Sequence, residues 1–507
     1  MKREVTASIS RSERRLIAGL IVLAALLRVF RLGAQSLWID EMLTLIAATP
    51  KPGIPLGTLL LHNIHGPLHT FVVALMRTVS ESEWWLRLPS AVAGVASVPL
   101  LYMWVRPRLG SRVATWAALL LAINPLHLHY SQELRNYAFA VCFVLLSCVL
   151  LDRLCERWSL RHAVAFSAGV AAAVLCNFSA VFAFVVQSIV FAKNTAPRAR
   201  AVPRWLVVTA VVILITSPWI YRVTTFVDFG KLVTPVQPGA LDPAELLRGD
   251  TTFRWESIPY TFYAYSVGFA LGPSLAEMHG DLNATVAQHR AAIAWTAIVF
   301  GVLAAGGLVS TWRRSAWRGG ELVLYIVVPL AATLALNWQN AKAFNVRYVL
   351  IGLPMFLTLV AAGIEAAGGK RRVAALALVV GTCVPALFNY YRDPARQKED
   401  VRAAVRAVEA RLQPGECIFA PTVFPIVAHY QTTSAPLHYI FHSTPEIVDR
   451  QMQGFYAAGC SSFWYLRARP WVDDPDGRVW SSIQSRYQAR EELDFPGVRV
   501  VHFISRN

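Results

Sequence analysis

The chain has 507 residues, 55% of them hydrophobic, with a mean hydropathy of +0.43 and a net charge of +17. Apolar runs of roughly 18 residues recur along it, which excludes an ordinary soluble protein and predicts a polytopic membrane protein. The cations cluster in short loops between these runs, so orientation in a bilayer explains the positive charge better than a nucleic-acid-binding surface does.

The first apolar run, residues 16–31, follows a basic segment that contains Arg14 and Arg15. No small-residue cleavage site follows the run, so we expect a retained span that starts in the cytoplasm rather than a removed signal peptide. Further apolar runs follow in order. They cover residues 88–105, 113–129, 136–152, 162–176, 178–192, 205–221, 291–310, 321–337, 346–364 and 373–389. The runs on either side of Asn177 predict a tight outer hairpin or one broken element.

Short basic segments alternate with polar connections of lower charge. Besides the N-terminus they are Arg106/Arg108/Arg112, Arg153/Arg157/Arg161, Lys193/Arg198/Arg200/Arg204, Arg313/Arg314/Arg318 and Lys370/Arg371/Arg372. A chain of eleven spans with a cytoplasmic start has six cytoplasmic segments. All six basic segments then fall on the cytoplasmic side.

The stretch from Pro67 to Val79 tests this count, because it is short for a span and contains His69 and Arg77. As a span it would invert the sidedness of every later run. We therefore predict that it lies in the membrane interface, within a first outer loop of residues 33–87. A second long outer loop is expected over residues 222–290.

The composition changes near residue 390. An amphipathic helical pattern is followed by short β-rich runs, so residues 1–389 are predicted to be the membrane domain and 390–507 a small extracytoplasmic α/β domain. The seven cysteines have no spacing typical of a metal site. Cys417 and Cys460 lie in the predicted outer domain, and whether they form a disulfide stays open.

Two adjacent acids, Asp40 and Glu41, follow Trp38 just beyond the first apolar run. A charged pair at the edge of a membrane core is costly unless it is solvated or functional. Trp38 is suited to headgroup depth and would fix the height of the pair. The plain alternative is the solvated start of a loop.

Other polar and aromatic side chains are expected on the same outer face. The candidates are His65, His69, Glu133, Arg135, Tyr137, Arg347 and Tyr348. Together with the acids they suit the chemistry of a lipid-linked sugar phosphate. Displacement at the anomeric carbon needs a carboxylate to take the proton of the acceptor, and cations to stabilise the departing phosphate. We assign the first role to Asp40 or Glu41 and the second to Arg135, Arg347 and His65, with Trp38, His69, Glu133, Tyr137 and Tyr348 lining the substrate.

Simpler roles stand beside these. The two arginines would also suit anchors to lipid headgroups, and the outer tyrosines an interfacial aromatic belt. The irregular spacing of the histidines argues against metal ligands without excluding them. No cofactor is therefore assigned, and a divalent metal is left open.

These residues, taken together, resemble the membrane-embedded C-type (GT-C) glycosyltransferases, which include protein O-mannosyltransferases and the lipid A aminoarabinose transferase. The motifs are Trp38-Ile39-Asp40-Glu41, His65-Gly66-Pro67-Leu68, Arg87-Leu88-Pro89-Ser90, Tyr130-Ser131-Gln132-Glu133-Leu134-Arg135-Asn136-Tyr137 and Arg347-Tyr348. The similarity covers residues 15–220 well, the rest of the membrane part loosely and the tail hardly at all.

The resemblance implies an inverting enzyme that uses a polyprenyl-phosphate sugar, with the acid of the first outer loop, here Asp40, as base or acceptor-positioning group. It also implies helices that lie along the membrane in that loop. Three departures concern donor binding. Gly66 stands where relatives commonly have proline, His65 would replace a phosphate-contacting lysine, and Asn177-Phe178-Ser179 replaces a histidine found near the sixth span in many relatives.

We therefore predict an α-helical polytopic membrane protein of about eleven spans that transfers a sugar from a polyprenyl phosphate at the outer face of the cytoplasmic membrane. Its expected partners are that donor, a lipid, protein or polysaccharide acceptor, and membrane lipids, but no nucleic acid. A transporter or flippase of lipid-linked sugars is the alternative, although the charges gather at span ends rather than at the midplane. The sugar, the acceptor, metal dependence and oligomeric state stay open.

Overall fold

The computed structural model describes residues 10–61, 66–195, 198–226, 255–274, 277–278, 281–338, 344–440 and 445–506. The chain divides into two compact units. The first, here the helical unit, comprises Met1–Leu32, Ala47–Val236 and Thr251–Tyr390. The second, here the sheet unit, comprises Gly33–Ile46, Gln237–Asp250 and Tyr391–Asn507. The acid pair of the first outer loop thus belongs with the C-terminal part of the chain.

The helical unit follows the predicted apolar runs closely. Its helices are α1 (Arg11–Val29), α3 (Leu56–Leu61), α4 (Pro67–Arg77), α5 (Glu83–Leu109), α6 (Ser111–Ile123), α7 (Pro125–Ser131), α8 (Tyr137–Glu156), α9 (Leu160–Cys176), α10 (Ala180–Asn194), α11 (Arg198–Phe226), α14 (Ser257–Val267), α16 (Leu282–Gln288), α17 (Arg290–Arg314), α18 (Ala316–Trp338), η1 (Val346–Tyr348), η2 (Leu350–Gly352), α19 (Leu353–Ala367) and α20 (Gly369–Arg392). Each predicted run coincides with one helix or with consecutive helices. Within the described residues, seven helices are long and apolar enough to cross a membrane, and three further apolar helices, α6, α9 and α10, are shorter.

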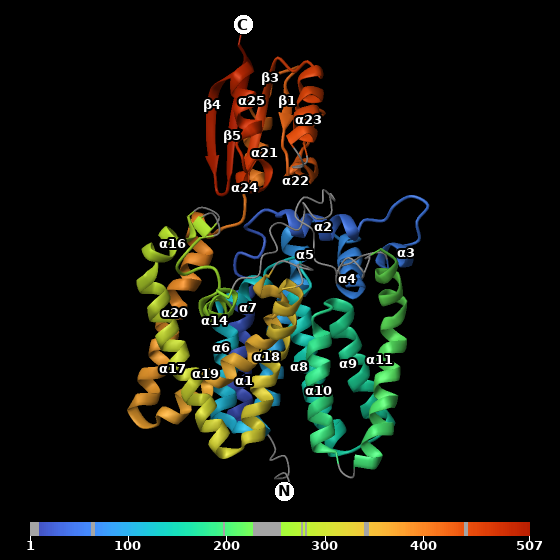
Figure 1. Cartoon of the computed structure of the whole chain (residues 1–507), viewed down its shortest axis with the longest axis vertical. Helices are drawn as coiled ribbons and strands as arrows, with labels where there is room; N and C mark the ends of the chain where they lie inside the picture. The colour runs from blue at the N-terminus through green and yellow to red at the C-terminus, as the bar shows by residue number, and fades with distance from the viewer. Residues whose placement is uncertain are drawn as a thin grey trace. The chain divides into compact units, whose positions relative to one another are not determined.

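Helix packing follows from small residues as well as from apolar ones. Helix α9 contacts both α8 and α11, and Figure 1 shows it beside α11. Helices α17 and α19 approach most closely at two glycines: a Cβ on Gly307 would lie 1.9 Å from the Leu359 carbonyl oxygen, and one on Gly363 would lie 2.0 Å from that of Leu303. Small residues allow backbones to approach in this way within a membrane, where burial of apolar surface gives no driving force between helices.

Ion pairs join the basic segments at one end of the helical unit. Arg106 pairs with Glu13 (3.0 Å), which brings the end of α5 to the start of α1. Arg108 pairs with Asp152 of α8 (2.5 Å) and with Glu321 of α18 (2.9 Å). All three members of this buried triad come from different helices, so it fixes the relative positions of their ends.

Two more contacts bring the remaining basic segments to the same end. The Glu365 carboxylate of α19 forms ion pairs with Arg372 of α20 (2.9 Å) and with Arg112 of α6 (3.5 Å). The Lys193 ammonium of α10 lies 5.9 Å from the ring centre of Trp317 at the start of α18. The six basic segments therefore share one end of the unit, as the alternation of charge predicts.

The sheet unit is a small α/β fold, confirming the predicted class for the C-terminal part. Its strands are β1 (Cys417–Phe419), β2 (Leu437–His438), β3 (Ser462–Ala468), β4 (Tyr487–Phe495) and β5 (Val498–Ser505), and its helices are α2 (Ile39–Ala47), η3 (Pro394–Arg396), α21 (Val401–Glu409), α22 (Phe424–Tyr430), α23 (Pro445–Ala457), α24 (Pro470–Asp473) and α25 (Arg478–Arg486). The strand order is β2-β1-β3-β5-β4 (Figure 1). Strand β1 is parallel to its neighbours, whereas β5 is antiparallel to β3 and β4.

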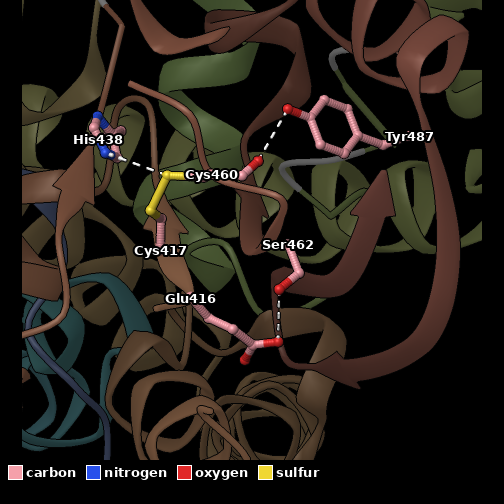
Figure 2. Close-up of a disulfide and its surroundings, with 6 residues drawn as sticks. All are labelled: Glu416, Cys417, His438, Cys460, Ser462 and Tyr487. Atoms are coloured by element: carbon pink, nitrogen blue, oxygen red, sulfur yellow. Dashed lines mark hydrogen bonds between the residues drawn. A yellow bond between two sulfur atoms is a disulfide. The ribbon is translucent and has the colours of Figure 1, made fainter. Parts of the chain in front are cut away.

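A disulfide joins Cys417 of β1 to Cys460, just before β3 (Figure 2). The Tyr487 hydroxyl donates to the Cys460 carbonyl oxygen (3.1 Å), and His438 Nε2 lies 3.8 Å from the Cys460 sulfur. The bond lies in an aromatic core and closes a loop of 43 residues. A cross-link of this kind stabilises mainly by restricting the unfolded chain.

Candidate functional site

A break in the predicted run 113–129 redirects the chain toward the candidate residues. Asn124 ends α6 and caps α7, because its side-chain oxygen accepts from the His127 amide (2.9 Å). Its side-chain nitrogen donates to the Tyr265 carbonyl oxygen of α14 (2.8 Å). Pro125 occupies the first turn of α7, where a missing amide proton costs nothing. The buried break places residues 129–137 beyond the end of α6.

Hydrogen bonds from side chains to backbone carbonyl oxygens fix the turn that carries Arg135. The Gln132 side chain donates to the carbonyl oxygens of Arg28 (2.9 Å) and Phe30 (2.8 Å), at the end of α1. The Ser90 hydroxyl of α5 donates to the Arg135 carbonyl oxygen (3.2 Å). Two of the motifs that resemble GT-C enzymes are thus in contact, and one positions the backbone of the other.

The motif around Gly66 lies near the same turn. A Cβ on Gly66 would lie 2.2 Å from the Leu175 carbonyl oxygen and 2.3 Å from that of Cys176. The Cys176 carbonyl oxygen also accepts from the Asn136 side chain (2.5 Å). This close backbone approach explains why glycine, and not the proline common in relatives, occupies position 66. His65, predicted to bind phosphate, lies outside the described residues.

Two predicted phosphate-binding arginines converge on one aromatic ring. The guanidinium carbons of Arg135 and Arg347 lie 5.6 Å and 5.8 Å from the ring centre of Tyr137. Arg135 donates to the Tyr137 hydroxyl (3.3 Å), and Arg347 donates to that of Tyr348 (3.3 Å). Arg135 is only 3% exposed, whereas Arg347 is half-buried. Two residues separated by more than 200 positions in the chain therefore form one cationic, aromatic cluster.

Local capping holds the second arginine in place. Asn345 precedes η1, and its side-chain oxygen accepts from the Arg347 amide (3.1 Å). The guanidinium carbon of Arg347 lies 5.3 Å from the ring centre of its neighbour Tyr348. Ring contacts with two tyrosines restrict the orientation of the side chain.

An acid and a histidine lie among aromatic rings beside this cluster. His129 pairs with Glu133 one turn later (3.1 Å), and Glu133 is 1% exposed. The His129 ring meets Tyr130, Phe269 and Tyr390 edge-on, with centroids 5.1, 5.2 and 5.9 Å away. Tyr130 in turn lies 5.0 Å from Tyr137. Aromatic faces with a few polar groups are the usual lining of a site for a polar, carbon-rich ligand.

The adjacent acids Asp40 and Glu41 differ in environment. Both lie in the first turn of α2, where the helix dipole favours negative charge. Glu41 is fully buried, and its carboxylate lies 3.3 Å from Lys398 Nζ. Asp40 is half-buried, and the hydroxyl of Thr44 donates to its backbone carbonyl oxygen (3.0 Å). Glu41 is thus buried in an ion pair, and Asp40 is the more accessible of the two acids.

Cations from the C-terminal segment surround Trp38, also predicted to line the substrate. Lys398 Nζ and the Arg469 guanidinium carbon lie 5.8 Å and 5.2 Å from its ring centre. Arg469 also forms an ion pair with Glu399, whose carbonyl oxygen accepts from Ser36 (2.6 Å). Sequence reasoning missed Lys398 and Arg469, because nothing local connects them to Trp38 across more than 350 positions of the chain.

The remaining candidate positions are less informative. His69 of α4 is 3% exposed, with its ring centre 5.3 Å from that of Phe139. Within the described part of the chain, one group of three side chains has metal-ligand types, namely Cys417, His438 and Cys460. Its two sulfurs are bonded to each other, so they are not thiolate ligands in this structure.

Comparison with known proteins bears on the fold of the chain. Residues 64–221 match the model of the dolichyl-phosphate-mannose-protein mannosyltransferase family. No curated protein matches the sequence. Among solved structures, apo ArnT from Cupriavidus metallidurans has a TM-score of 0.58 at 10% identity, covering 97% of this chain and 98% of ArnT.

Two further structures extend this agreement. ArnT from the same organism bound to undecaprenyl phosphate has a TM-score of 0.54 at 11% identity, with 96% and 97% of the two chains covered. The arabinofuranosyltransferase AftD from Mycobacteria has a TM-score of 0.51 at 15% identity, covering 100% of this chain and 41% of AftD. The chain is therefore a multi-pass membrane protein with the GT-C fold of membrane glycosyltransferases.

Proposed function

We propose that this protein is an inverting glycosyltransferase that moves a sugar from a polyprenyl phosphate to an acceptor at the outer face of the cytoplasmic membrane. The observation that carries the proposal is the convergence of Arg135 and Arg347 on the ring of Tyr137. Two guanidinium groups on one ring can each give a phosphate a charge-assisted hydrogen bond. The solved ArnT complex with undecaprenyl phosphate supports a lipid phosphate as the ligand.

The arginines would act on the leaving group. As the bond from the anomeric carbon to the phosphate oxygen breaks, negative charge builds on the phosphate. Guanidinium groups fixed in advance stabilise that charge without reorganising. Arg135 is held by Tyr137 and by its backbone hydrogen bond from Ser90, so it is suited to this role.

We assign the role of base to Asp40. The acceptor oxygen attacks the anomeric carbon from the side opposite the phosphate, which inverts the configuration, and its proton passes to the Asp40 carboxylate. Glu41, buried against Lys398, would keep α2 in place rather than react. This division of roles narrows the acid pair to one reactive member.

His129, Glu133, Tyr137 and Tyr348 would line the sugar. Glu133 and His129 offer hydrogen-bonding groups that are oriented by their mutual contact (3.1 Å). The surrounding rings supply flat apolar faces for the sugar carbons.

We place the basic end of the helical unit in the cytoplasm, by the positive-inside rule. Arg135 and Arg347 lie in connections at the opposite ends of their helices, and so at the outer face. The N-terminus would then be cytoplasmic and the C-terminal domain extracytoplasmic. This orientation can be checked by labelling single cysteines introduced at positions 40 and 313.

Binding of undecaprenyl phosphate to purified protein tests the proposal directly. We expect Arg135→Gln and Arg347→Gln each to weaken binding by about tenfold or more, the value of one charge-assisted contact. Arg313→Gln removes the same charge from the basic end and should leave binding unchanged. Equal affinities of all four proteins would contradict the assignment of the phosphate.

Turnover separates the enzyme from the transporter. In detergent no compartments exist, so release of sugar from a polyprenyl-phosphate donor, or its transfer, reports catalysis alone. Asp40→Asn should abolish transfer, by about a thousandfold or more, while undecaprenyl phosphate still binds. Donor binding without any turnover by the wild type would favour a transporter, and normal turnover by Asp40→Asn would remove Asp40 from the mechanism.

A further inference from the structure

A cavity of about 210 Å³ lies at the basic end of the helical unit, away from Arg135 and Arg347. Its walls come from the α8–α9 connection, the end of α10 and the start of α11. They include Leu154, Trp158, Phe191, Asn194 and Arg204. The lining therefore combines an amide and a cation with aromatic side chains where α8, α10 and α11 meet.

Arg204 is positioned by an aromatic platform. Its guanidinium carbon lies 5.1 Å from the ring centre of Trp158. Trp158 in turn contacts Phe191 (6.4 Å between ring centres), and Phe191 stacks on Trp205 at 4.6 Å. The cation is thus fixed on a wall of packed rings, rather than carried on a free surface side chain.

The cavity also lies in a positive environment. Arg153, Arg157 and Lys193 are exposed, and each is adjacent in sequence to a residue that lines the cavity. One acid, Glu156, also lines it. Arg204 and Glu156 line the cavity with opposite charges, so its net positive surroundings come from the three neighbouring cations, and these favour an anion.

Tryptophans indicate the depth of the cavity. Trp158 lines it, and Trp317 lies 5.9 Å from the Lys193 ammonium at the same end of the unit. Tryptophan prefers the level of lipid headgroups, so the cavity opens at the depth where phosphates of the inner leaflet lie. Basic pockets between helices on this side are known to suit anionic headgroups.

We propose that this cavity binds a phosphate ester, and specifically the headgroup of an anionic phospholipid, with Arg204 contacting the phosphate. The volume is enough for a phosphate and a small polar substituent but not for a whole lipid, whose chains would follow the surface of the helices. Asn194 would hydrogen-bond the headgroup. The inference is independent of the transferase reaction, because the residues that carry it lie at the other end of the helical unit.

Lipid titration of the full-length protein provides the test. Delipidated protein is placed in nanodiscs of phosphatidylcholine alone or with phosphatidylglycerol, and retained phosphatidylglycerol is counted by native mass spectrometry. We expect the wild type to retain phosphatidylglycerol selectively and Arg204→Gln to need about fivefold more for the same occupancy. Arg313→Gln is the matched control, since it removes an exposed arginine from the same end, and it should behave as the wild type.

Two further arms give sharper outcomes. Trp158→Phe keeps a ring under the guanidinium and should retain selectivity, whereas Trp158→Leu should lose much of it. Inorganic phosphate and glycerol phosphate should not displace the lipid. Displacement by either one would assign the cavity to a soluble phosphate compound and overturn the lipid. Equal retention by Arg204→Gln and Arg313→Gln would overturn the site itself.

Discussion

The two ends of the helical unit use arginine in opposite ways. At the basic end, Arg108 lies between Asp152 (2.5 Å) and Glu321 (2.9 Å), so its charge is matched within the fold. At the other end, Arg135 and Arg347 gather around one tyrosine. At the basic end two acids from other helices bind one arginine, whereas at the other end two arginines share one aromatic ring, an arrangement that we assign to an anionic ligand.

This difference separates residues that maintain the fold from residues that we assign to function. A buried triad loses most when one member is removed, because the others stay behind unpaired. A pair of like charges should lose little stability, or gain some, when one member is neutralised. Stability measurements at the two ends should therefore give opposite results.

The largest effect is expected for Arg108→Gln. Asp152 and Glu321 would then be left as adjacent carboxylates in a buried position, which should cost about 3–5 kcal/mol of unfolding free energy. Thermal unfolding of the purified protein in detergent measures the change. Arg313→Gln, an exposed neutralisation at the same end, should stay within about 0.5 kcal/mol of the wild type.

If Arg108→Gln and Arg313→Gln have the same unfolding temperature, the triad does not hold the helices together. The comparison of the two ends would then fail. A second variant, Glu321→Gln, removes one acid but leaves Asp152 to pair with Arg108, so it should fall between the two.

A smaller effect is expected at Gly66. Replacement by alanine places a Cβ 2.2 Å from the Leu175 carbonyl oxygen, so the backbone must shift. Overpacking of this kind typically costs about 1–3 kcal/mol. Gly57→Ala is a matched control, because a Cβ on this exposed glycine of α3 meets nothing within 4 Å.

Gly66→Ala also tests the end of the helical unit that carries Arg135 and Arg347. Gly66 and Asn136 both contact the Cys176 carbonyl, and Asn136 follows Arg135. A shift at Gly66 should therefore weaken undecaprenyl phosphate binding as well as stability. Loss of stability with unchanged binding would separate this contact from the arginine cluster.

A feature of the fold or of the site could be predicted where it depends on residues close together in the sequence. Apolar runs and basic loops are local patterns, so the helices and the common end of the basic segments follow from the sequence. Arg135 and Arg347 could be named as candidates, since each has a local motif. Their meeting at Tyr137 could not be derived, because it depends on the packing of distant helices.

The features that could not be predicted mostly join residues that are far apart in the chain. Lys398 and Arg469 contact Trp38 through a segment that the sequence places in a separate domain. The pairing of Cys417 with Cys460 was left open for the same reason, since spacing alone does not select a partner. The break at Asn124 was missed because the apolar residues on both sides were joined into one run, although Asn124-Pro125 is a local signal of a helix boundary.

The third prediction concerns the stability of the arginine cluster itself. Without ligand, Arg135→Gln or Arg347→Gln should change unfolding free energy by less than about 1 kcal/mol, since relief of repulsion offsets the lost contacts with tyrosine. Undecaprenyl phosphate should raise the unfolding temperature of the wild type but not that of either variant. Strong destabilisation of the unliganded variants, comparable to Arg108→Gln, would make these arginines structural.

The smallest effect is expected at Glu277, which lies before α17, at the end away from the basic segments. The Ser274 side chain, followed by the Ser274 amide and His289, lowers the pKa of Glu277 from 4.5 to about 2. A depressed folded pKa means that this contact contributes stability above pH 4.5 and loses it as the pH falls toward 2. Because the carboxylate is more than one-third exposed, the change in stability should be slight.

Esterification by a diazo reagent, which requires a protonated carboxyl, measures the titration of Glu277 by mass spectrometry. At pH 3 only about a tenth of Glu277 should be protonated in the wild type. Ser274→Ala removes the largest cause of the shift, so its midpoint should move up toward 4.5. If both proteins label alike at pH 3, the hydrogen bond from Ser274 does not govern this carboxylate.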